Sequence, residues 1–283
     1  MTLSLATLDT VLAEQADGLE LTIHGLPDPA AGADARGEIA RLVIHRKGKA
    51  NAMNRALMTR FVAMVDGLAA RPAMRALVVT GTDAIFVGGA DIDEMSGLDA
   101  PGGRAFITQV HQCCDSLRRA PFPVIAAVNG LTLGAGLELA AAADMRVAVT
   151  SARFGMPEVR LGIPSVVEAA LLPGLVGWGA TRQMLLLGDL FDAAEALRIG
   201  FVEKVVEPAA LAAQVDAWLG SLMASGPAAV RDQKALIRRW EQLPLAEAVS
   251  AGIDAFSASW RTPEPARMMQ AWQAERQARK QRR

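Results

Sequence analysis

Two glycine-rich stretches stand out as places where backbone amides can do chemistry. Residues 86–95 read FVGGADIDEM and residues 129–138 read NGLTLGAGLE, and each is typical of a loop that leads into a helix. Glycine lets a ligand approach the main chain closely, and the first N–H groups of a helix have no partner within that helix. Two such loops can direct two N–H groups at one carbonyl oxygen and stabilise an oxyanion. Tight packing of a strand against a helix would also explain either stretch alone.

Several other kinds of active site are excluded. The sequence has no dinucleotide-binding glycine motif after a strand, no P-loop and no G-x-S-x-G nucleophile elbow. Tyrosine is absent, and His24, His45 and His111 are far apart in sequence, so we interpret each histidine as structural or exposed. Cys113 and Cys114 are adjacent, which disfavours a disulfide between them, and no His/Cys spacing indicates a metal site. Carboxylates and backbone amides therefore remain as the groups that could carry out the chemistry.

The composition is that of a globular protein. Of the 283 residues 52 % are hydrophobic and 21 % are charged, and the formal net charge of −1 argues against general nucleic-acid binding. The N-terminal segment lacks the basic start of a signal peptide, and unpaired cysteines are typical of the cytoplasm, which is where we expect this protein. Residues 124–143 are apolar, but Asn129, Glu138 and three glycines favour a buried segment over a membrane span.

Strands and helices alternate in the first two thirds of the chain, which predicts an α/β core with largely parallel pairing. The expected strands are 19–24, 39–46, 76–80, 124–128 and 145–149, and the expected helices are 55–70, 103–118 and 134–142. Residues 25–37 are rich in Pro, Gly and Asp, so we expect an exposed hairpin loop or small insertion there.

The pattern changes near residue 207. Residues 209–224, 228–240, 245–260 and 265–280 all read as helices. We therefore divide the chain into a core, residues 1–207, and a C-terminal helical region, residues 208–283, that is expected to mediate oligomerisation. A helical layer folded back on its own subunit would give the same pattern.

The motifs, taken in order, resemble those of the crotonase (enoyl-CoA hydratase/isomerase) superfamily. GGADIDEM is similar to its first signature, NGLTLGAGLELAAAADMRVA to its second, and ARFGMPEVRLGIP to the segment that follows. KANAMN resembles its early coenzyme A loop, and GWGATRQMLLLGDLFDAAEALRIGFVEKVV a later helix-and-strand stretch. The likeness extends from about residue 38 to residue 280. It implies a spiral of ββα units with two nearly perpendicular sheets, and a homo-oligomer that is a trimer or a dimer of trimers.

The resemblance also implies roles for four residues. The N–H groups of Ala90 and Ala135 would form the oxyanion hole, although the superfamily usually has glycine where this chain has Ala135. Glu138 and Glu158 match the two hydratase glutamates. Adding water to an α,β-unsaturated acyl-CoA thioester needs a base for the water that attacks the β-carbon and an acid for the α-carbon. We assign Glu138 as that base and Glu158 as that acid, with the roles open to sharing.

One stretch departs from the superfamily pattern. Residues 162–173 read GIPSVVEAALLP where hydratases usually have a glycine-rich turn. This segment flanks the acyl pocket, so an acyl group other than a simple straight chain stays open. Glu168 is either a third pocket carboxylate or, as we favour, a side chain on a helix surface or near a helix N-terminus.

The remaining substrate contacts are those that the resemblance implies for coenzyme A and the acyl group. Lys49 would meet a phosphate, the backbone at Ala52 and Ile92 would lie along the adenine or pantetheine, and Trp260 would lie near the acyl tail. Coenzyme A is part of the substrate, so neither a separate cofactor nor a metal is expected.

The predicted function is that of an enoyl-CoA hydratase. Within the same fold, double-bond isomerisation, thioester hydrolysis and decarboxylation are the alternatives. A further alternative is a non-catalytic protein that binds RNA through the basic residues 276–283. Because both glutamates are present, hydration is favoured and no nucleic-acid partner is expected.

Overall fold

The computed structural model of the chain describes residues 3–281 and contains two β-sheets surrounded by helices. The larger sheet has seven strands, which lie in the order β1 (Asp9–Ala16), β2 (Leu19–Pro27), β3 (Arg36–Ile44), β4 (Met74–Gly81), β6 (Val124–Val128), β8 (Met145–Val149) and β11 (Lys204–Val206). The pairings from β1 to β3 are antiparallel, and those from β3 to β11 are parallel.

The smaller sheet is built from short strands that follow the strands of the larger one. Its order is β10 (Phe191–Asp192), β9 (Arg153–Gly155), β7 (Leu131–Leu133) and β5 (Ile85–Val87). Thus β5 follows β4, β7 follows β6, and β9 follows β8, so each turn of the chain adds one strand to each sheet. The α/β class, the largely parallel pairing and the repeated two-sheet unit expected from the sequence are confirmed.

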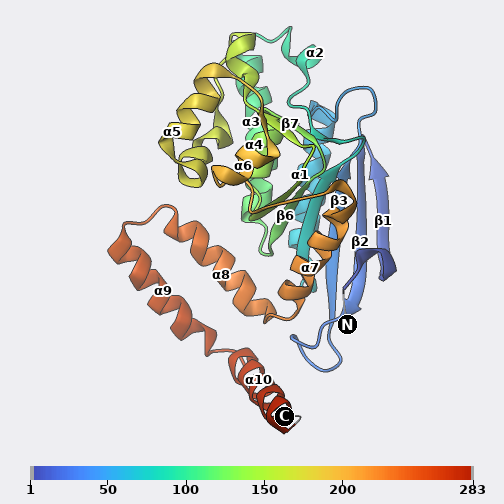
Figure 1. Cartoon of the computed structure of the whole chain (residues 1–283), viewed down its shortest axis with the longest axis vertical. Helices are drawn as coiled ribbons and strands as arrows, with labels where there is room; N and C mark the ends of the chain where they lie inside the picture. Colours follow the sequence, from blue (N-terminus) through green and yellow to red (C-terminus); the bar gives the residue numbers. More distant parts are fainter. Residues whose placement is uncertain (1–2, 282–283) are drawn as a thin grey trace.

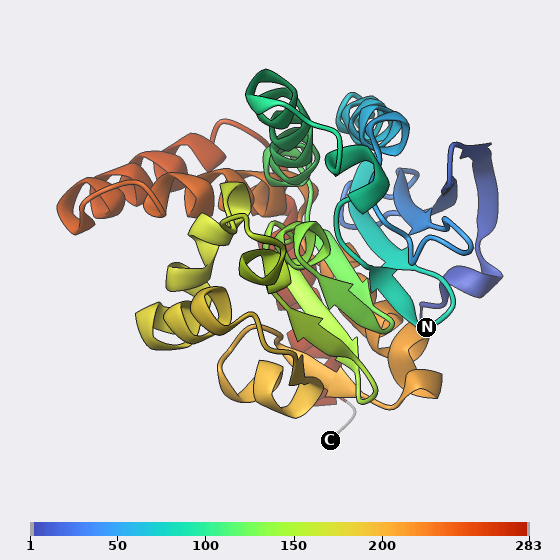
Figure 2. The ribbon, with the colours of Figure 1, turned by 90° about the horizontal axis from the view of Figure 1, so that it is seen from above.

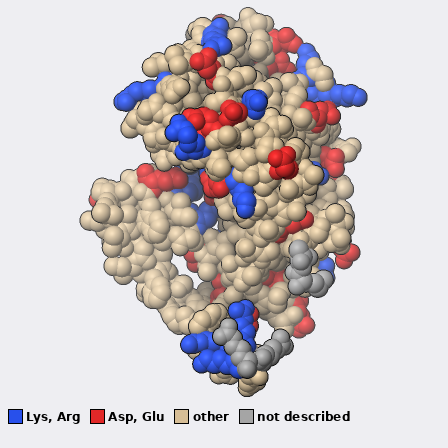
Figure 3. Space-filling model, viewed as in Figure 1, with Lys and Arg blue, Asp and Glu red and all other residues tan. Residues whose placement is uncertain are grey.

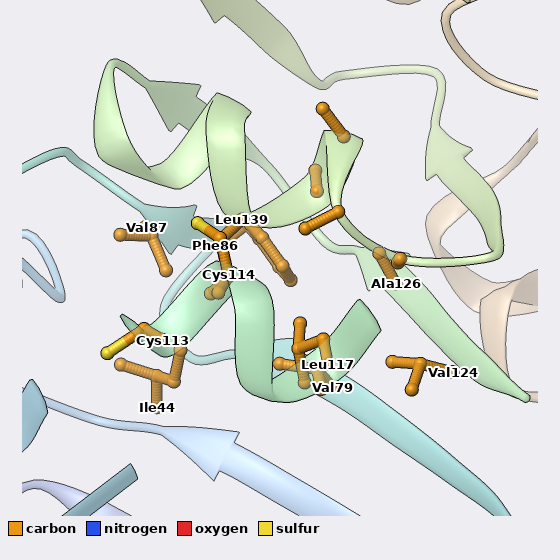
Figure 4. Packing of buried hydrophobic residues seen from close by; sticks show 14 of the residues in the cluster. Ile44, Val79, Phe86, Val87, Cys113, Cys114, Leu117, Val124, Ala126 and Leu139 are labelled. Atoms are coloured by element: carbon orange, nitrogen blue, oxygen red, sulfur yellow. The ribbon is translucent and has the colours of Figure 1, made fainter. Parts of the chain in front are cut away.

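Both faces of the larger sheet are covered, which explains its uniformly apolar central strands. Every residue of β4 is buried: Leu77 and Val79 point toward one face, and Ala76 and Val78 toward the other. Figure 4 shows Val79 packed near Leu117 and Val124 in the main core, with Cys113 and Cys114 close by. The two cysteines are buried and free.

Helices occupy the two sides of this sheet (Figure 1, Figure 2). One side carries α1 (Arg55–Ala69), α3 (Ala100–Arg119) and α4 (Ala135–Ala141), and the other carries α7 (Leu211–Met223). The short α2 (Ile92–Met95) follows β5, and α5 (Leu172–Leu187) and α6 (Ala193–Arg198) follow β9 and β10. Side-chain caps begin several of these helices; Asn54, for example, accepts the Leu57 N–H at the start of α1.

The C-terminal helices differ in how they contact the rest of the chain. Val215 and Leu219 of α7 are buried against the larger sheet. On α8 (Pro227–Trp240), the buried Lys234 donates to the carbonyls of Leu117 and Phe122 and pairs with Asp144. In contrast, α9 (Leu245–Ser259) and α10 (Glu264–Gln281) extend away from the sheets (Figure 1).

The N-terminal part of the chain differs from the expectation in two ways. The strand β1 was not expected, because its sequence alternates poorly and its residues are mostly exposed. The segment 25–37 is partly strand, because β2 and β3 continue into it, and only its middle is a turn. Asp28 in that turn is buried against Arg75, so the expectation of an exposed loop was wrong there.

Residues 124–143 form β6, β7 and the buried α4, as expected for an internal segment. No helix within residues 3–281 is long and apolar enough to cross a membrane.

Candidate active site

Glycines hold the two predicted amide loops against each other. Gly134 has φ 50° and ψ −120°, a conformation that glycine adopts most readily, and it turns the chain from β7 into α4. An added methyl group at Gly136 would collide with the carbonyl of Val87, at the end of β5. An added methyl at Gly88 would likewise collide with the backbone of Ala50. The start of α4 therefore lies directly against the first loop, which in turn lies against the 49–54 loop.

The amides of Ala90 and Ala135 lie in these two loops, and neither is used by regular backbone pairing. Ala135 is the first residue of α4, so its N–H has no acceptor within the helix. Ala90 forms a parallel bridge with Met53, but the hydrogen bonds of this bridge come from the residues on either side of Ala90. The Gly89 carbonyl accepts from the Met53 N–H, and the Asp91 N–H donates to the Met53 carbonyl. The N–H of Ala90 therefore points away from Met53. Both alanines line the same pocket.

The first loop is fixed by a buried ion pair. Asp91 caps α2 by accepting from the N–H groups of Asp93 and Glu94, and its second oxygen lies 2.7 Å from Nη1 of Arg46. The same Arg46 nitrogen donates to the carbonyl of Ala52 at 2.7 Å. The hydrogen bond from Arg46, with the backbone bonds, holds the pKa of Asp91 below its usual range. One guanidinium thus joins the loop that bears Ala90 to the 49–54 loop.

The pocket in front of these amides has a volume of about 240 Å³. Its walls are largely apolar, with Met95, Ile107, Val110, Leu133 and Val166 among them. Two acidic side chains line it, those of Glu138 and Glu158. The structure thus places both predicted glutamates and both predicted donor residues around one cavity.

Glu138 is the more deeply buried of the two glutamates. It belongs to the first turn of α4, is only 4 % exposed, and its Oε1 accepts from the Ala169 N–H at 3.1 Å. Burial, together with the charges of Glu158 and Glu168, raises the pKa of Glu138 to about 8, although the bond from Ala169 opposes the shift. A pKa near 8 favours the protonated form of this carboxyl at neutral pH.

Glu158 lines the pocket where it is more exposed to solvent than at Glu138. It begins the short 3-10 helix Pro157–Leu161 and is partly exposed. Its Oε2 accepts from the Ser165 hydroxyl at 2.8 Å. Its other oxygen lies so close to Gly134 that an added methyl group on that glycine would collide with it. The carboxylate of Glu158 is therefore held beside the start of α4.

The preferred interpretation of Glu168 was wrong about the surface and right about the helix N-terminus, because the residue lies in a first helical turn but is buried. The residue lies in the 3-10 helix Val167–Leu171 and is 6 % exposed, so it is not on a helix surface. Its Oε1 lies 2.8 Å from Nδ1 of His111. Burial raises the pKa of Glu168, and the hydrogen bond to His111 opposes this. The side chain does not line the pocket, yet its charge acts on Glu138.

The three expected coenzyme A contacts lie close together, and Trp260, which was expected near the acyl tail, lies elsewhere. Lys49 is about half exposed and its Nζ lies 2.7 Å from Oδ2 of Asp93, which follows Ile92. Ile92 is exposed and lines the pocket, and Ala52 is tied to the same region through Arg46. Trp260 follows α9, is 51 % exposed and packs against Phe256, so it does not line the pocket of its own chain.

Sequence reasoning did not identify three groups at this site. These are the Ser165 hydroxyl, the Ala169 N–H and the Arg46–Asp91 pair. Only the last left a local signal, because Asp91 followed by Glu94 is typical of a helix start. In residues 3–281 no group of three or more His, Cys, Asp or Glu side chains is placed to hold a metal ion.

The basic C-terminal residues form the end of α10, where Lys and Arg gather in Figure 3. Arg279 pairs with Glu275, and Arg276 stacks over the ring of Trp272. Cations at a helix C-terminus also complement the helix dipole. The last two arginines of this tail, 282 and 283, lie outside the described residues.

Comparison with known proteins agrees with this geometry. Residues 34–281 match the enoyl-CoA hydratase/isomerase family. The chain is 38 % identical over 243 residues to a crotonyl-CoA hydratase of Syntrophomonas wolfei, covering 85 % of this chain and 94 % of that protein. It is 34 % identical to a short-chain-enoyl-CoA hydratase of Clostridium acetobutylicum, covering 84 % and 92 %. An enoyl-CoA hydratase structure from Bacillus anthracis superposes with a TM-score of 0.81 at 28 % identity, covering 84 % and 93 %. The chain therefore belongs to the enoyl-CoA hydratase/isomerase family, the crotonase superfamily.

Proposed function

We propose that this protein is an enoyl-CoA hydratase that adds water across the double bond of a short α,β-unsaturated acyl-CoA thioester. The observation that carries the proposal is the pair of glutamates, Glu138 and Glu158, which line one small apolar pocket together with Ala90 and Ala135. Relatives at 34–38 % identity are named as crotonyl-CoA and short-chain-enoyl-CoA hydratases. A cavity of about 240 Å³ suits a short acyl group.

The amides account for the activation of the thioester. When water attacks the β-carbon, negative charge moves to the thioester oxygen and an enolate forms. The N–H groups of Ala90 and Ala135 would donate to that oxygen, and each such donor lowers the barrier by about 3 kcal/mol. Because the loops are fixed by Gly134, Gly136 and the Arg46–Asp91 pair, the donors need no rearrangement during the reaction.

The two carboxyl groups account for the protons. Hydration needs one base and one acid, so the pair must carry one proton in total. The raised pKa of Glu138 supports that state, because it favours the proton on Glu138 at neutral pH. One carboxylate accepts a proton from the attacking water, and the α-carbon receives one from the pair. We therefore assign the base and acid roles to the pair as a unit, in line with the sharing that the sequence left open.

No atom outside the protein, the thioester and water takes part in this scheme, so the proposal includes no metal and no separate cofactor. Coenzyme A would lie along the Lys49–Asp93 edge, with Ala52 and Ile92 beside it. The free, buried Cys113 and Cys114 support a reducing compartment such as the cytoplasm.

The test is turnover of crotonyl-CoA. Loss of the absorbance of the conjugated enoyl thioester, with 3-hydroxybutyryl-CoA identified by mass spectrometry, would support hydration. Appearance of free coenzyme A would point instead to thioester hydrolysis, and a shifted double bond without gain of water to isomerisation. Either of those products as the main one would refute the proposal.

We also propose that the protein forms a homo-oligomer through α9, as a trimer or a dimer of trimers. Along α9 and just after it, five large apolar side chains recur every three or four residues and are 51–82 % exposed: Leu245, Val249, Ile253, Phe256 and Trp260. Such a continuous apolar stripe on a helix is typical of a protein–protein contact. A monomer of about 30 kDa in sedimentation at micromolar concentration would contradict this proposal.

A further inference from the structure

Glu168 is a buried carboxyl group that the proposed chemistry does not use. Its Oε1 bonds with His111, while its Oε2 is buried and accepts no hydrogen bond from an N–H or O–H group of the described residues; the neighbouring Cys114 thiol is only a weak donor. Burying a polar atom without a partner is unfavourable, and an apolar side chain of similar size would fill the same space without that cost. The position therefore calls for an explanation beyond packing.

The backbone around Glu168 is strained. Val167 has φ 41°, a left-handed conformation that a β-branched residue rarely adopts and that costs about 1–3 kcal/mol. Through this turn the chain directs the Glu168 side chain inward and brings the next residue, Ala169, to Glu138. The Ala169 N–H then donates to Glu138 Oε1 at 3.1 Å. The strain is thus located directly at the hydrogen bond that orients a catalytic carboxyl.

His111 supports this turn from the outside. Its side chain is half exposed, on α3, and lines a wide surface hollow together with Val167. Ile107 and Val166 line both this hollow and the reaction pocket, so the turn forms part of the wall between them. Cys114, also on α3, lies nearby: burial and then the charges of Glu168 and Glu138 raise the pKa of its thiol.

We propose that Glu168 is a positioning residue for Glu138: paired with His111, it holds the strained turn 167–169 so that the Ala169 N–H stays on the Glu138 carboxyl. This inference rests on the proposed hydratase function, because it assumes that Glu138 is part of the reacting pair. The inference also gives a role to residues 162–173, the stretch that departs from the glycine-rich turn expected from the resemblance. In this chain the Glu168 side chain ties the turn to α3 through His111.

The experiment compares Glu168→Leu with Glu168→Gln. Leucine is similar in size but cannot bond with His111, whereas the glutamine amide can donate to or accept from the imidazole in either tautomer. Glu168→Leu should lower kcat for crotonyl-CoA roughly tenfold, with KM within about twofold of wild type. Its melting temperature should not fall, because an apolar group replaces an incompletely bonded one. Glu168→Gln should recover kcat to within about threefold of wild type.

Two further measurements separate this role from a general loss of structure. Hydrogen–deuterium exchange of the peptide that contains Ala169 should be faster in Glu168→Leu and close to wild type in Glu168→Gln. Cys113→Ala, a truncation on the same helix where the thiol meets the Met58 carbonyl, is the matched control and should leave kcat unchanged.

Full kcat in Glu168→Leu, or no recovery in Glu168→Gln, would overturn the inference. If wild-type protein does not hydrate crotonyl-CoA, the proposed function fails instead, and the exchange of the Ala169 peptide still decides whether Glu168 holds the turn.

Discussion

Replacing Glu138 by glutamine should inactivate the enzyme and yet stabilise its fold, by an amount that grows with pH. The glutamine carbonyl can accept the Ala169 N–H that Glu138 now accepts, so the packing is kept. What disappears is an ionisable group whose charged form is disfavoured by burial and by the neighbouring charges of Glu158 and Glu168.

The magnitude follows from the pKa of Glu138, which is about 8 in the fold against an ordinary value of 4.5 for a glutamate. Below pH 4.5 the carboxyl is protonated in both states and costs nothing. As pH rises toward 8, the folded state still binds a proton that the unfolded state has lost, so the free energy of unfolding falls. This penalty is about 1 kcal/mol at pH 5 and about 4 kcal/mol at pH 8. Glutamine does not titrate, so the Glu138→Gln variant does not lose this stability as pH rises.

The assay is thermal or urea unfolding of both proteins at pH 5 and pH 8, at one protein concentration because the proposed oligomerisation would add to stability. The advantage of Glu138→Gln should be about 3 kcal/mol larger at pH 8, or roughly 5 °C in melting temperature for a chain of this length. Glu207→Gln, which removes an exposed glutamate, is the control and should show the same difference from wild type at both pH values. An equal advantage of Glu138→Gln at pH 5 and pH 8 would refute the reasoning.

Four further predictions concern activity and assembly. Glu158→Gln should bind crotonyl-CoA but turn it over about a hundredfold more slowly. Adding Glu138→Gln should lower the rate by much less than a second factor of that size, since the pair acts on one water. Near-normal rates in both single variants would contradict the glutamate assignment. Phe256→Glu should shift the sedimentation coefficient to that of a smaller species, because it places a charge in the apolar stripe of α9, and an unchanged coefficient would remove α9 from the interface. Arg46→Met should lower kcat/KM by an order of magnitude or more, since it releases Asp91 and the Ala90 loop from the 49–54 loop, and wild-type kinetics would show that the pair is dispensable. Dialysis against EDTA should leave turnover unchanged, and a loss that added metal restores would refute the carboxylate mechanism.

Much of the fold could be predicted because its signals are local. The buried strands β4, β6 and β8 are short apolar runs, and parallel strands covered on both faces must be apolar throughout. The helices α1 and α3 repeat apolar residues at helical spacing. The short strands β5, β7, β9 and β10 were missed, because two or three residues carry no periodicity. They exist only because each pairs with a neighbour that is distant in sequence.

By itself the sequence determined the family, the two glycine loops and the positions of Glu138 and Glu158, because these depend on the identity and order of residues. The tertiary structure decided which groups surround those carboxyls. Whether Glu168 points outward or inward depends on the left-handed turn at Val167 and on His111, which is 57 residues away in the chain. The raised pKa of Glu138 likewise comes from burial and from charges on other segments. Electrostatics and hydrogen bonding act through space, so no local pattern in the sequence records them.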